Sequence, residues 1–176
     1  MKFSKLVLAI GIATSLISAA HAAAPKDSVS KKITLTAQIN DAIFVSKPDG
    51  STWYSTEELD ADDYQQKKFS KTLPVRVWSK NSEFNVSLAQ PLKMSNGNYE
   101  MTNPEVTIGS GQGEVPVSFG NSQKITQITA GNGGFDEIHD LNIKVDAPVQ
   151  NGQLSTNGSY SGDLVMVFEP VAATGP

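Results

Sequence analysis

Short segments in which apolar and polar side chains alternate recur along most of this 176-residue chain. A period of two places every second side chain on the same face of an extended strand, so each segment predicts a strand with one buried face. The clearest examples are LPVRVW (73–78), with Leu73, Val75 and Val77 in register, and EFNVSLA (83–89), with Phe84, Val86 and Leu88 in register. This alternation favours two packed sheets over a helical architecture.

Further segments extend the pattern to about eight short strands, a spacing typical of an immunoglobulin-like sandwich. Turn residues separate them, and Lys80-Asn81-Ser82 predicts a hairpin between the two clearest strands. The other predicted strands are DAIFVS (41–46), PEVTIG (104–109), EVPVSFGN (114–121), KITQIT (124–129), LNIKVDAPV (141–149) and SYSGDLVMVFEP (159–170).

One segment departs from the alternation. STEELDADDYQQKKFSK (55–71) has capping-box spacing between Ser55 and Glu58, and its acidic residues precede its lysines, which favours a short surface helix or an acidic loop. Asp60, Asp62 and Asp63 are candidate calcium ligands. The EF-hand pattern is incomplete, however, so we interpret the three carboxylates as solvated surface.

The first 22 residues have the features of an export signal. Lysines in MKFSK precede the apolar run LVLAIGIATSLIS, and Ala20-His21-Ala22 forms a small-x-small cleavage site. The apolar run is shorter than the ~20 residues that cross a bilayer, which argues against a retained anchor. We therefore expect a signal peptide over 1–22, an N-terminal extension over 23–40 and one domain over 41–176.

The extension contains a strand of its own. KKITLTAQIN (31–40) alternates strictly, with one face formed by Ile33, Leu35, Ala37 and Ile39. A strand that precedes the domain requires a partner that buries this apolar face. At the other end of the chain, EPVAATGP is a poor closing strand because of its prolines and glycine.

Composition excludes several kinds of function. The net charge of −4 argues against nucleic acid as a partner, and the absence of cysteine excludes disulfides and a cysteine nucleophile. Without the signal, His139 is the only histidine, and no catalytic, cofactor or metal motif is recognisable. We expect no enzyme, no cofactor and no metal. A hydrolase centred on His139, beside Asp136, Glu137 and Asp140, is an alternative, but a solvated polar loop is the favoured interpretation.

Five segments, taken in order, resemble the colonisation-factor pilins. These are the major subunits of class 5 fimbriae, which the alternate chaperone–usher route assembles, with colonisation factor antigen one as the best-known member. The segments are KKITLTAQINDAIFVSKPDG, LPVRVWSKNSEFNVSLAQPL, EVPVSFGN, LNIKVDAPV and GSYSGDLVMVFEP, of which Ser159-Tyr160-Ser161-Gly162 is the most specific part.

The resemblance implies an incomplete immunoglobulin-like β-sandwich that the N-terminal donor strand of a neighbouring subunit completes. It implies that Ile33, Leu35, Ala37 and Ile39 are the donor-strand plugs. It also implies that the strand flanking the acceptor groove carries Tyr160, Leu164, Met166 and Phe168.

The expected function is that of the shaft subunit of an adhesive fimbria, because a single domain leaves no room for the separate receptor-binding domain of a tip protein. Expected partners are further copies of the chain, a periplasmic chaperone, an outer-membrane usher, a tip adhesin and a host cell-surface glycan. The expected route leads through the periplasm to the surface of a Gram-negative cell. The alternative is a self-contained secreted β-sandwich that binds carbohydrate. Its candidate stacking residues, for which core or rim packing is the commoner role, are Trp53, Trp78, Phe84 and Tyr160.

Overall fold

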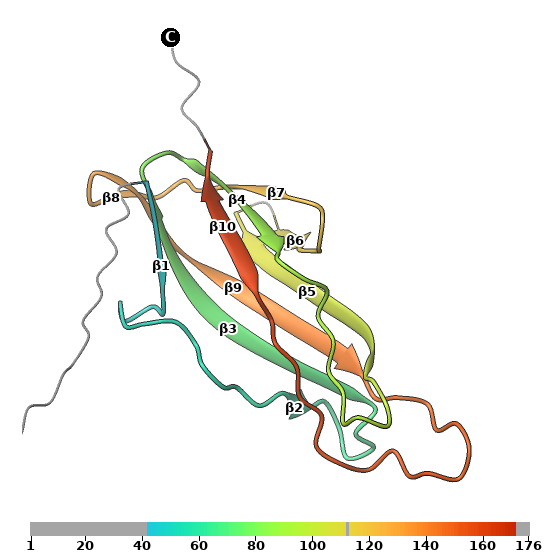
Figure 1. Cartoon of the computed structure of the whole chain (residues 1–176). Coiled ribbons are helices and arrows are strands. Elements are labelled where there is room, and N and C mark those ends of the chain that lie inside the picture. The colour runs from blue at the N-terminus through green and yellow to red at the C-terminus, as the bar shows by residue number, and fades with distance from the viewer. Residues whose placement is uncertain (1–41, 112, 172–176) are drawn as a thin grey trace, which may run out of the picture. The chain divides into compact units, whose positions relative to one another are not determined.

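The structure is a computed structural model that describes residues 42–111 and 113–171. The described residues form strands and loops without a helix, as the alternation predicted (Figure 1). No helix of this part is long and apolar enough to cross a membrane. The strands are β1 (Ile43–Ser46), β2 (Asp60–Ala61), β3 (Lys68–Ser79), β4 (Glu83–Leu88), β5 (Thr102–Ser110), β6 (Gly113–Pro116), β7 (Gln123–Thr126), β8 (Ala130–Gly131), β9 (Gly134–Asp146) and β10 (Met166–Pro170).

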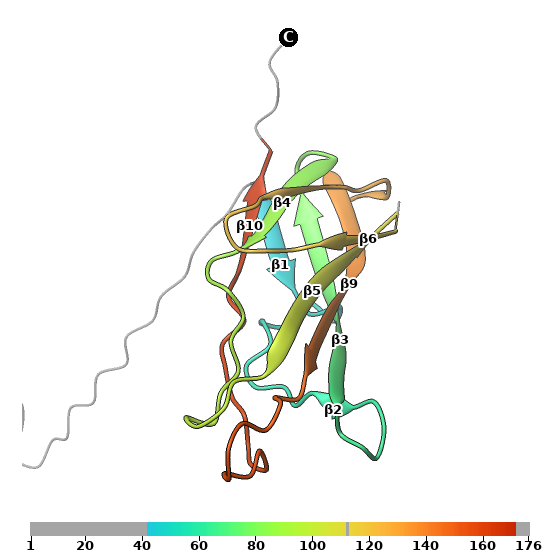
Figure 2. The ribbon, with the colours of Figure 1, turned by 90° about the vertical axis from the view of Figure 1, so that its right-hand side faces the viewer.

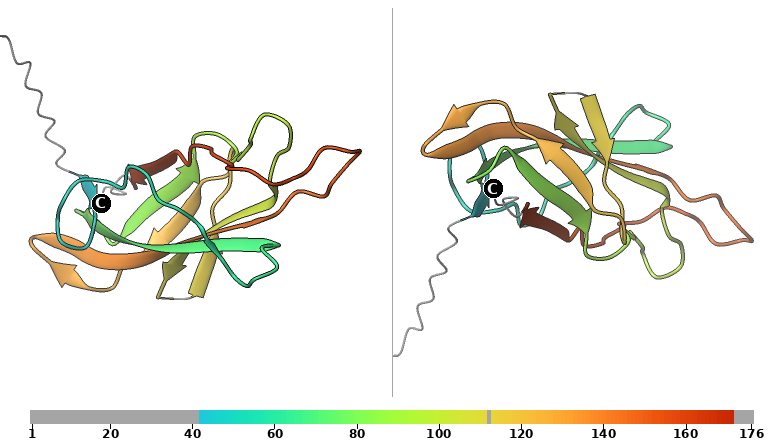
Figure 3. Two further views of the ribbon diagram at one scale, coloured as in Figure 1. Left: turned by 90° about the horizontal axis from the view of Figure 1, so that it is seen from below. Right: turned by 90° about the horizontal axis from the view of Figure 1, so that it is seen from above.

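Two antiparallel sheets pack face to face as a sandwich (Figures 2 and 3). The larger sheet has the strand order β1-β3-β9-β5-β6, with β2 added to β3 and β8 added to β9. The smaller sheet has the order β10-β4-β7. Strands β3 and β9 pair along twelve positions, from Lys68 opposite Asp146 to Ser79 opposite Phe135, and form the centre of the larger sheet.

The core lies between the sheets and includes the side chains that the alternation assigned to the buried faces of 73–78 and 83–89, whereas Leu92 and Met101 lie outside the predicted strands. In β3, Val75 and Val77 are fully buried, and Phe84 of β4 faces them from the smaller sheet. Burying each such side chain contributes about 1.5–3 kcal/mol. The other core residues are Leu73, Val86, Leu88, Leu92, Met101, Val106, Ile108, Val117, Ile125, Leu141, Ile143 and Val145.

The hairpin predicted at Lys80–Ser82 is wrong. A turn lies there, but it carries the chain from β3 in the larger sheet to β4 in the smaller one. Both edges of β3 are already paired, with β1 on one side and β9 on the other. Strand β4 must therefore find its backbone partners elsewhere, in β10 and β7.

The helix considered at 55–71 does not form. The segment runs extended, enters β2, turns at residues 62–67 and continues into β3. Tertiary contacts override the capping signal, because Asp60 pairs with Ser70 across the strands and its carboxylate accepts a hydrogen bond from Lys71 at 2.9 Å. Among the described residues, no cluster of three acidic, histidine or cysteine side chains has an arrangement that could hold a metal ion.

Candidate functional site

An open groove runs between two extended segments that are about 100 residues apart in the sequence. One wall is 53–59, which follows β1. The other begins with 158–165, which lines the hollows, and continues into β10, where Phe168 meets Trp53. Two adjoining hollows of about 330 Å³ and 730 Å³ form its deepest parts. Core side chains make the floor, with Leu73, Leu141 and Ile143 below the smaller hollow and Phe69, Met94 and Met101 below the larger.

The backbone of both walls is unpaired on the groove side. Within the described part of the chain, residues 52–59 make no backbone–backbone hydrogen bond. On the other wall, Ser161 pairs with Ser95 and the Val165 carbonyl accepts from Ala89, and both contacts lie on the side away from 53–59. Strands β1 and β10 lie near each other without a shared ladder. At the groove, therefore, each of the two sheets ends in an edge whose backbone is unpaired among the described residues.

Of the four predicted acceptor residues, Tyr160 and Leu164 line the hollows, and Met166 and Phe168 follow in β10. Each is half-buried and packs against the core: Tyr160, Leu164, Met166 and Phe168. The strand predicted over 159–170 is regular only in β10, because upstream the chain makes a single bridge, Ser161 to Ser95, instead of a ladder.

Gly162 explains the most specific of the quoted motifs. A Cβ built at Gly162 would lie within 1.9 Å of the Lys93 carbonyl oxygen, so no side chain fits there. The glycine has the same strand parity as Tyr160 and Leu164, and both hollows border it. The Lys93 carbonyl occupies the place of a side chain at residue 162, so this position of the wall carries none.

Trp53 joins the two walls of the groove. Its indole meets the Phe168 ring edge to face at a centroid distance of 5.9 Å, and it meets Tyr54 at 5.8 Å. The Tyr54 hydroxyl donates to the Pro74 carbonyl at 2.8 Å, which anchors this wall on β3. Sequence reasoning missed the 53–59 wall, because the segment lacks alternation. The adjacent aromatic residues Trp53 and Tyr54 were the sequence feature that could have indicated this wall.

The aromatic residues considered for sugar stacking do not form an exposed platform. Phe84 is fully buried, and Tyr160 is half-buried with its hydroxyl donating to the Thr156 carbonyl. Trp78 lies on β3, with a buried indole nitrogen, and Trp53 contacts Phe168. The packing role is confirmed for Phe84.

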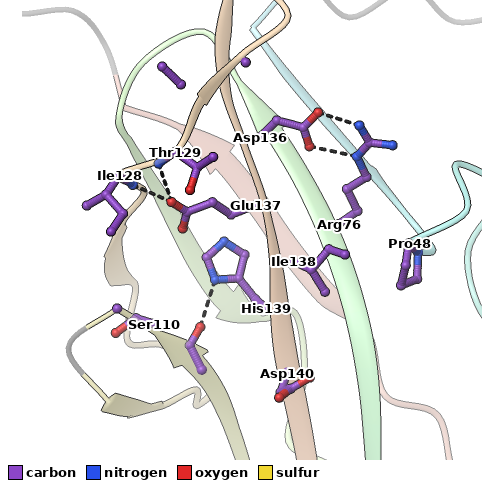
Figure 4. A pocket seen from close by; sticks show the side chains of 14 residues that line it. Pro48, Arg76, Ser110, Ile128, Thr129, Asp136, Glu137, Ile138, His139 and Asp140 are labelled. Carbon is purple, nitrogen blue, oxygen red and sulfur yellow. Dashed lines mark hydrogen bonds and ion pairs between the residues drawn. The ribbon is translucent and has the colours of Figure 1, made fainter.

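The solvated loop expected around His139 is wrong, because the residue lies within β9 and is only 3% exposed. Its Nδ1–H donates to the Gly109 carbonyl at 2.8 Å (Figure 4). Its ring also meets Phe84 edge to face. Buried Gln127 lies beside it and donates from Nε2 to the Val77 carbonyl at 2.8 Å. His139 points into the core from β9, as Leu141 does two residues later. The polar residues around His139 do not show this strand register, so its burial was not predicted.

Two of the three carboxylates beside His139, those of Asp136 and Glu137, are engaged by other partners (Figure 4). Asp136 accepts two hydrogen bonds from Arg76, which hold the pKa of that carboxyl below its usual value. Burial raises the pKa of Glu137, but hydrogen bonds from the amides of Thr129 and Ile128 outweigh it and leave that pKa lowered. These contacts stabilise the β8–β9 hairpin, and none of the three neighbouring acids hydrogen-bonds to His139.

The predicted signal peptide and the predicted plugs Ile33, Leu35, Ala37 and Ile39 lie outside the described residues.

Comparisons with known proteins agree with this architecture. The family model described as "CS1 type fimbrial major subunit" matches residues 29–169. No curated protein sequence is significantly similar. Among solved structures, the CooA pilin subunit from enterotoxigenic Escherichia coli is similar, with a TM-score of 0.53 and 15% identity over 74% of this chain and 99% of that chain. At that identity the likeness shows a shared pilin fold, whereas the family match covers most of the sequence. The chain therefore belongs to the CS1 type fimbrial major subunit family and is a structural shaft subunit of a surface fimbria.

Proposed function

We propose that the subunit polymerises by strand donation, in which residues 31–40 of one copy fill the groove of the next. The observation that carries this proposal is the groove itself, with unpaired backbone on both walls and core side chains on its floor. An added strand could pair with both edges and cover the apolar floor at the same time.

The predicted donor strand and the groove wall agree in length and in the spacing of their apolar side chains. The wall from Tyr160 to Phe168 is close in length to KKITLTAQIN, and both present apolar side chains at alternate positions. In this proposal Ile33, Leu35, Ala37 and Ile39 enter the groove. The three larger plugs would contribute about 1.5–3 kcal/mol each before the cost of ordering the strand.

An open groove also needs protection before assembly. Unpaired strand edges beside exposed apolar side chains promote aggregation. We therefore infer a periplasmic chaperone that covers the groove, an outer-membrane usher that exchanges it for a donor strand, and a tip adhesin at the end of the fibre. The predicted signal at 1–22 supports transit through the periplasm. The family supports a structural role rather than a catalytic one.

The test is a pair of charge substitutions in the donor segment of the full chain. Leu35→Asp places a charge on the plug face, and Thr36→Asp places the same charge on the opposite face. We expect Leu35→Asp to abolish fibres in electron micrographs of the cell surface while the subunit is still exported, and Thr36→Asp to retain them. Normal fibres from Leu35→Asp would overturn the proposal.

A second test measures complementation directly. The domain 41–176 is prepared without its extension, and its melting temperature is recorded with and without a synthetic KKITLTAQIN peptide. A ligand that binds only the folded state raises the melting temperature. We expect a rise that disappears when aspartate replaces Leu35 in the peptide.

A further inference from the structure

Exposed large apolar side chains lie at the two opposite ends of the described domain. The turn between β2 and β3 and the loop after β9 lie at the lower end in Figures 1 and 2. In these segments Tyr64, Val149 and Leu154 are 91%, 82% and 63% exposed. The segment between β7 and β8 lies at the upper end, and its Ile128 is 79% exposed. Isolated exposed apolar residues are ordinary, but residues gathered on the tips of neighbouring loops suggest a contact surface.

Hydrogen bonds hold the lower-end loops in place. The Tyr99 hydroxyl lies 2.9 Å from the carbonyls of Asn151 and Leu154, which ties the 96–99 loop to the 147–157 loop. The Ala147 amide donates to the Lys67 carbonyl at 2.8 Å, which ties the same loop to the 62–67 turn. These hydrogen bonds join the loops that carry Tyr64, Val149 and Leu154, and the exposed side of these loops is called here the lower surface.

The described part of the chain begins at the upper end, just before β1. The Ala42 carbonyl accepts from the Lys80 amide at 3.0 Å, and the Ser82 carbonyl accepts from the Gln127 amide at 2.7 Å. Asn81 Nδ2 donates to the Val171 carbonyl at 2.9 Å. The start of the domain, the 80–82 turn and the segment carrying Ile128 are consequently neighbours, called here the upper surface.

Strand donation limits how two copies can meet, and the following step rests on the proposed function. Only residues 40 and 41 separate the last predicted plug, Ile39, from Ala42, a reach of about 10 Å in an extended chain. The upper surface of a donating copy must therefore lie against the end of the groove at which its strand leaves.

That end must be the lower one. If the donor left at the upper end, the upper surface of each copy would have to contact the upper surfaces of both neighbours, and the fibre could not extend. A head-to-tail contact, by contrast, repeats without limit. A donor that leaves at the lower end runs antiparallel to β10, as do the other paired strands of the described sheets.

We propose that the lower surface docks on the upper surface of the next copy of this chain, as a second contact beside the donor strand. Tyr64, Val149 and Leu154 would bury apolar area against Ile128 and the 80–82 turn. Charge supports the same pairing, because Asp63 at the lower turn and Lys80 at the upper turn have no ion-pair partner among the described residues. A second contact would restrict bending at the short link between successive domains.

Cross-linking tests this contact cleanly, because the chain contains no cysteine. Fibres of the full chain carrying both Leu154→Cys and Ile128→Cys are treated with a short bismaleimide, boiled in SDS and separated on a denaturing gel. We expect a ladder of covalent multimers from the double variant. Neither single variant should form a ladder, because a head-to-tail contact never brings two identical positions together.

A second double variant, Tyr64→Cys with Asn81→Cys, repeats the test with other members of the same two surfaces. If both double variants form fibres but neither gives a ladder on the gel, the end contact is overturned. Loss of fibres in Leu35→Asp would in that case still support strand donation. If Leu35→Asp still forms fibres and the double cysteine variants give a ladder, strand donation is overturned and the end contact stands. If Leu35→Asp still forms fibres and the double cysteine variants give no ladder, both proposals are overturned.

Discussion

Trp53 and Phe168 meet edge to face across the groove, with ring centroids 5.9 Å apart and ring planes at 73°. They come from opposite walls, and Phe168 also lies against Phe84 in the core at 6.1 Å. The aromatic contact therefore connects the 53–59 wall to the core through β10. It is a direct contact between the two free edges in the subunit as described.

Replacing Trp53 with alanine should weaken the subunit that has no donor strand. An edge-to-face pair contributes about 0.5–1.5 kcal/mol beyond area burial. We expect a lower urea midpoint for the domain 41–176 carrying Trp53→Ala. Tyr64→Ala, at an aromatic residue that is 91% exposed, is the matched control and should leave the midpoint unchanged. Equal midpoints for the two variants would show that the aromatic bridge contributes nothing.

Gly162→Ala should be strongly destabilising. The new Cβ would meet backbone rather than a movable side chain, since the Lys93 carbonyl oxygen lies 1.9 Å from its ideal position. Overpacking typically costs about 1–3 kcal/mol, and backbone displacement adds to it. Gly111→Ala is the control, because its Cβ would meet nothing within 4 Å. Equilibrium denaturation of both variants measures the difference, and an unchanged stability for Gly162→Ala would contradict the close approach.

Gln127→Leu should cost about 1–3 kcal/mol, because it leaves buried polar groups without partners. The Val77 carbonyl would lose its side-chain donor, and the Ser79 hydroxyl would lose the Gln127 oxygen that lies 2.6 Å away. Gln90→Leu, at an exposed position, is the comparison. A leucine at 127 that leaves the denaturation midpoint unchanged would mean that the polar cluster is dispensable.

The ion pair between Arg76 and Asp136 should make part of the stability acid-sensitive. The hydrogen bond from Arg76 lowers the pKa of Asp136 in the folded state. Its contribution is therefore complete above the pKa of the unfolded chain, near 3.9, and is lost as the pH falls through the lower folded value. We expect Asp136→Asn to flatten the fall of the urea midpoint between neutral and strongly acidic pH.

The control for that measurement is Asp140→Asn, which removes the same charge from an exposed carboxylate with no ion-pair partner among the described residues. A pH profile for Asp136→Asn that overlays the profile of Asp140→Asn would show that the ion pair does not couple stability to pH.

Much of the local structure was predictable because strand patterning is a local signal. The alternation in 73–78 and 83–89 identified strands and their buried faces correctly. It overestimated strand length at 114–121, where β6 ends at Pro116 and Phe119 is exposed. The fimbrial family was predictable too, because the order of several weak motifs carries more information than any one of them.

The amino-acid pattern was sufficient for the all-β class and for the inward faces of the central strands, and it predicts an apolar strand at 31–40. These properties depend on neighbours two residues apart, so a short window of sequence contains them. Contacts between distant segments, by contrast, placed β3 and β4 in different sheets, turned His139 toward the core and set 53–59 opposite 158–168. Backbone pairing and packing depend on segments far apart in the chain, because each strand pairs with whichever free edge the other strands leave.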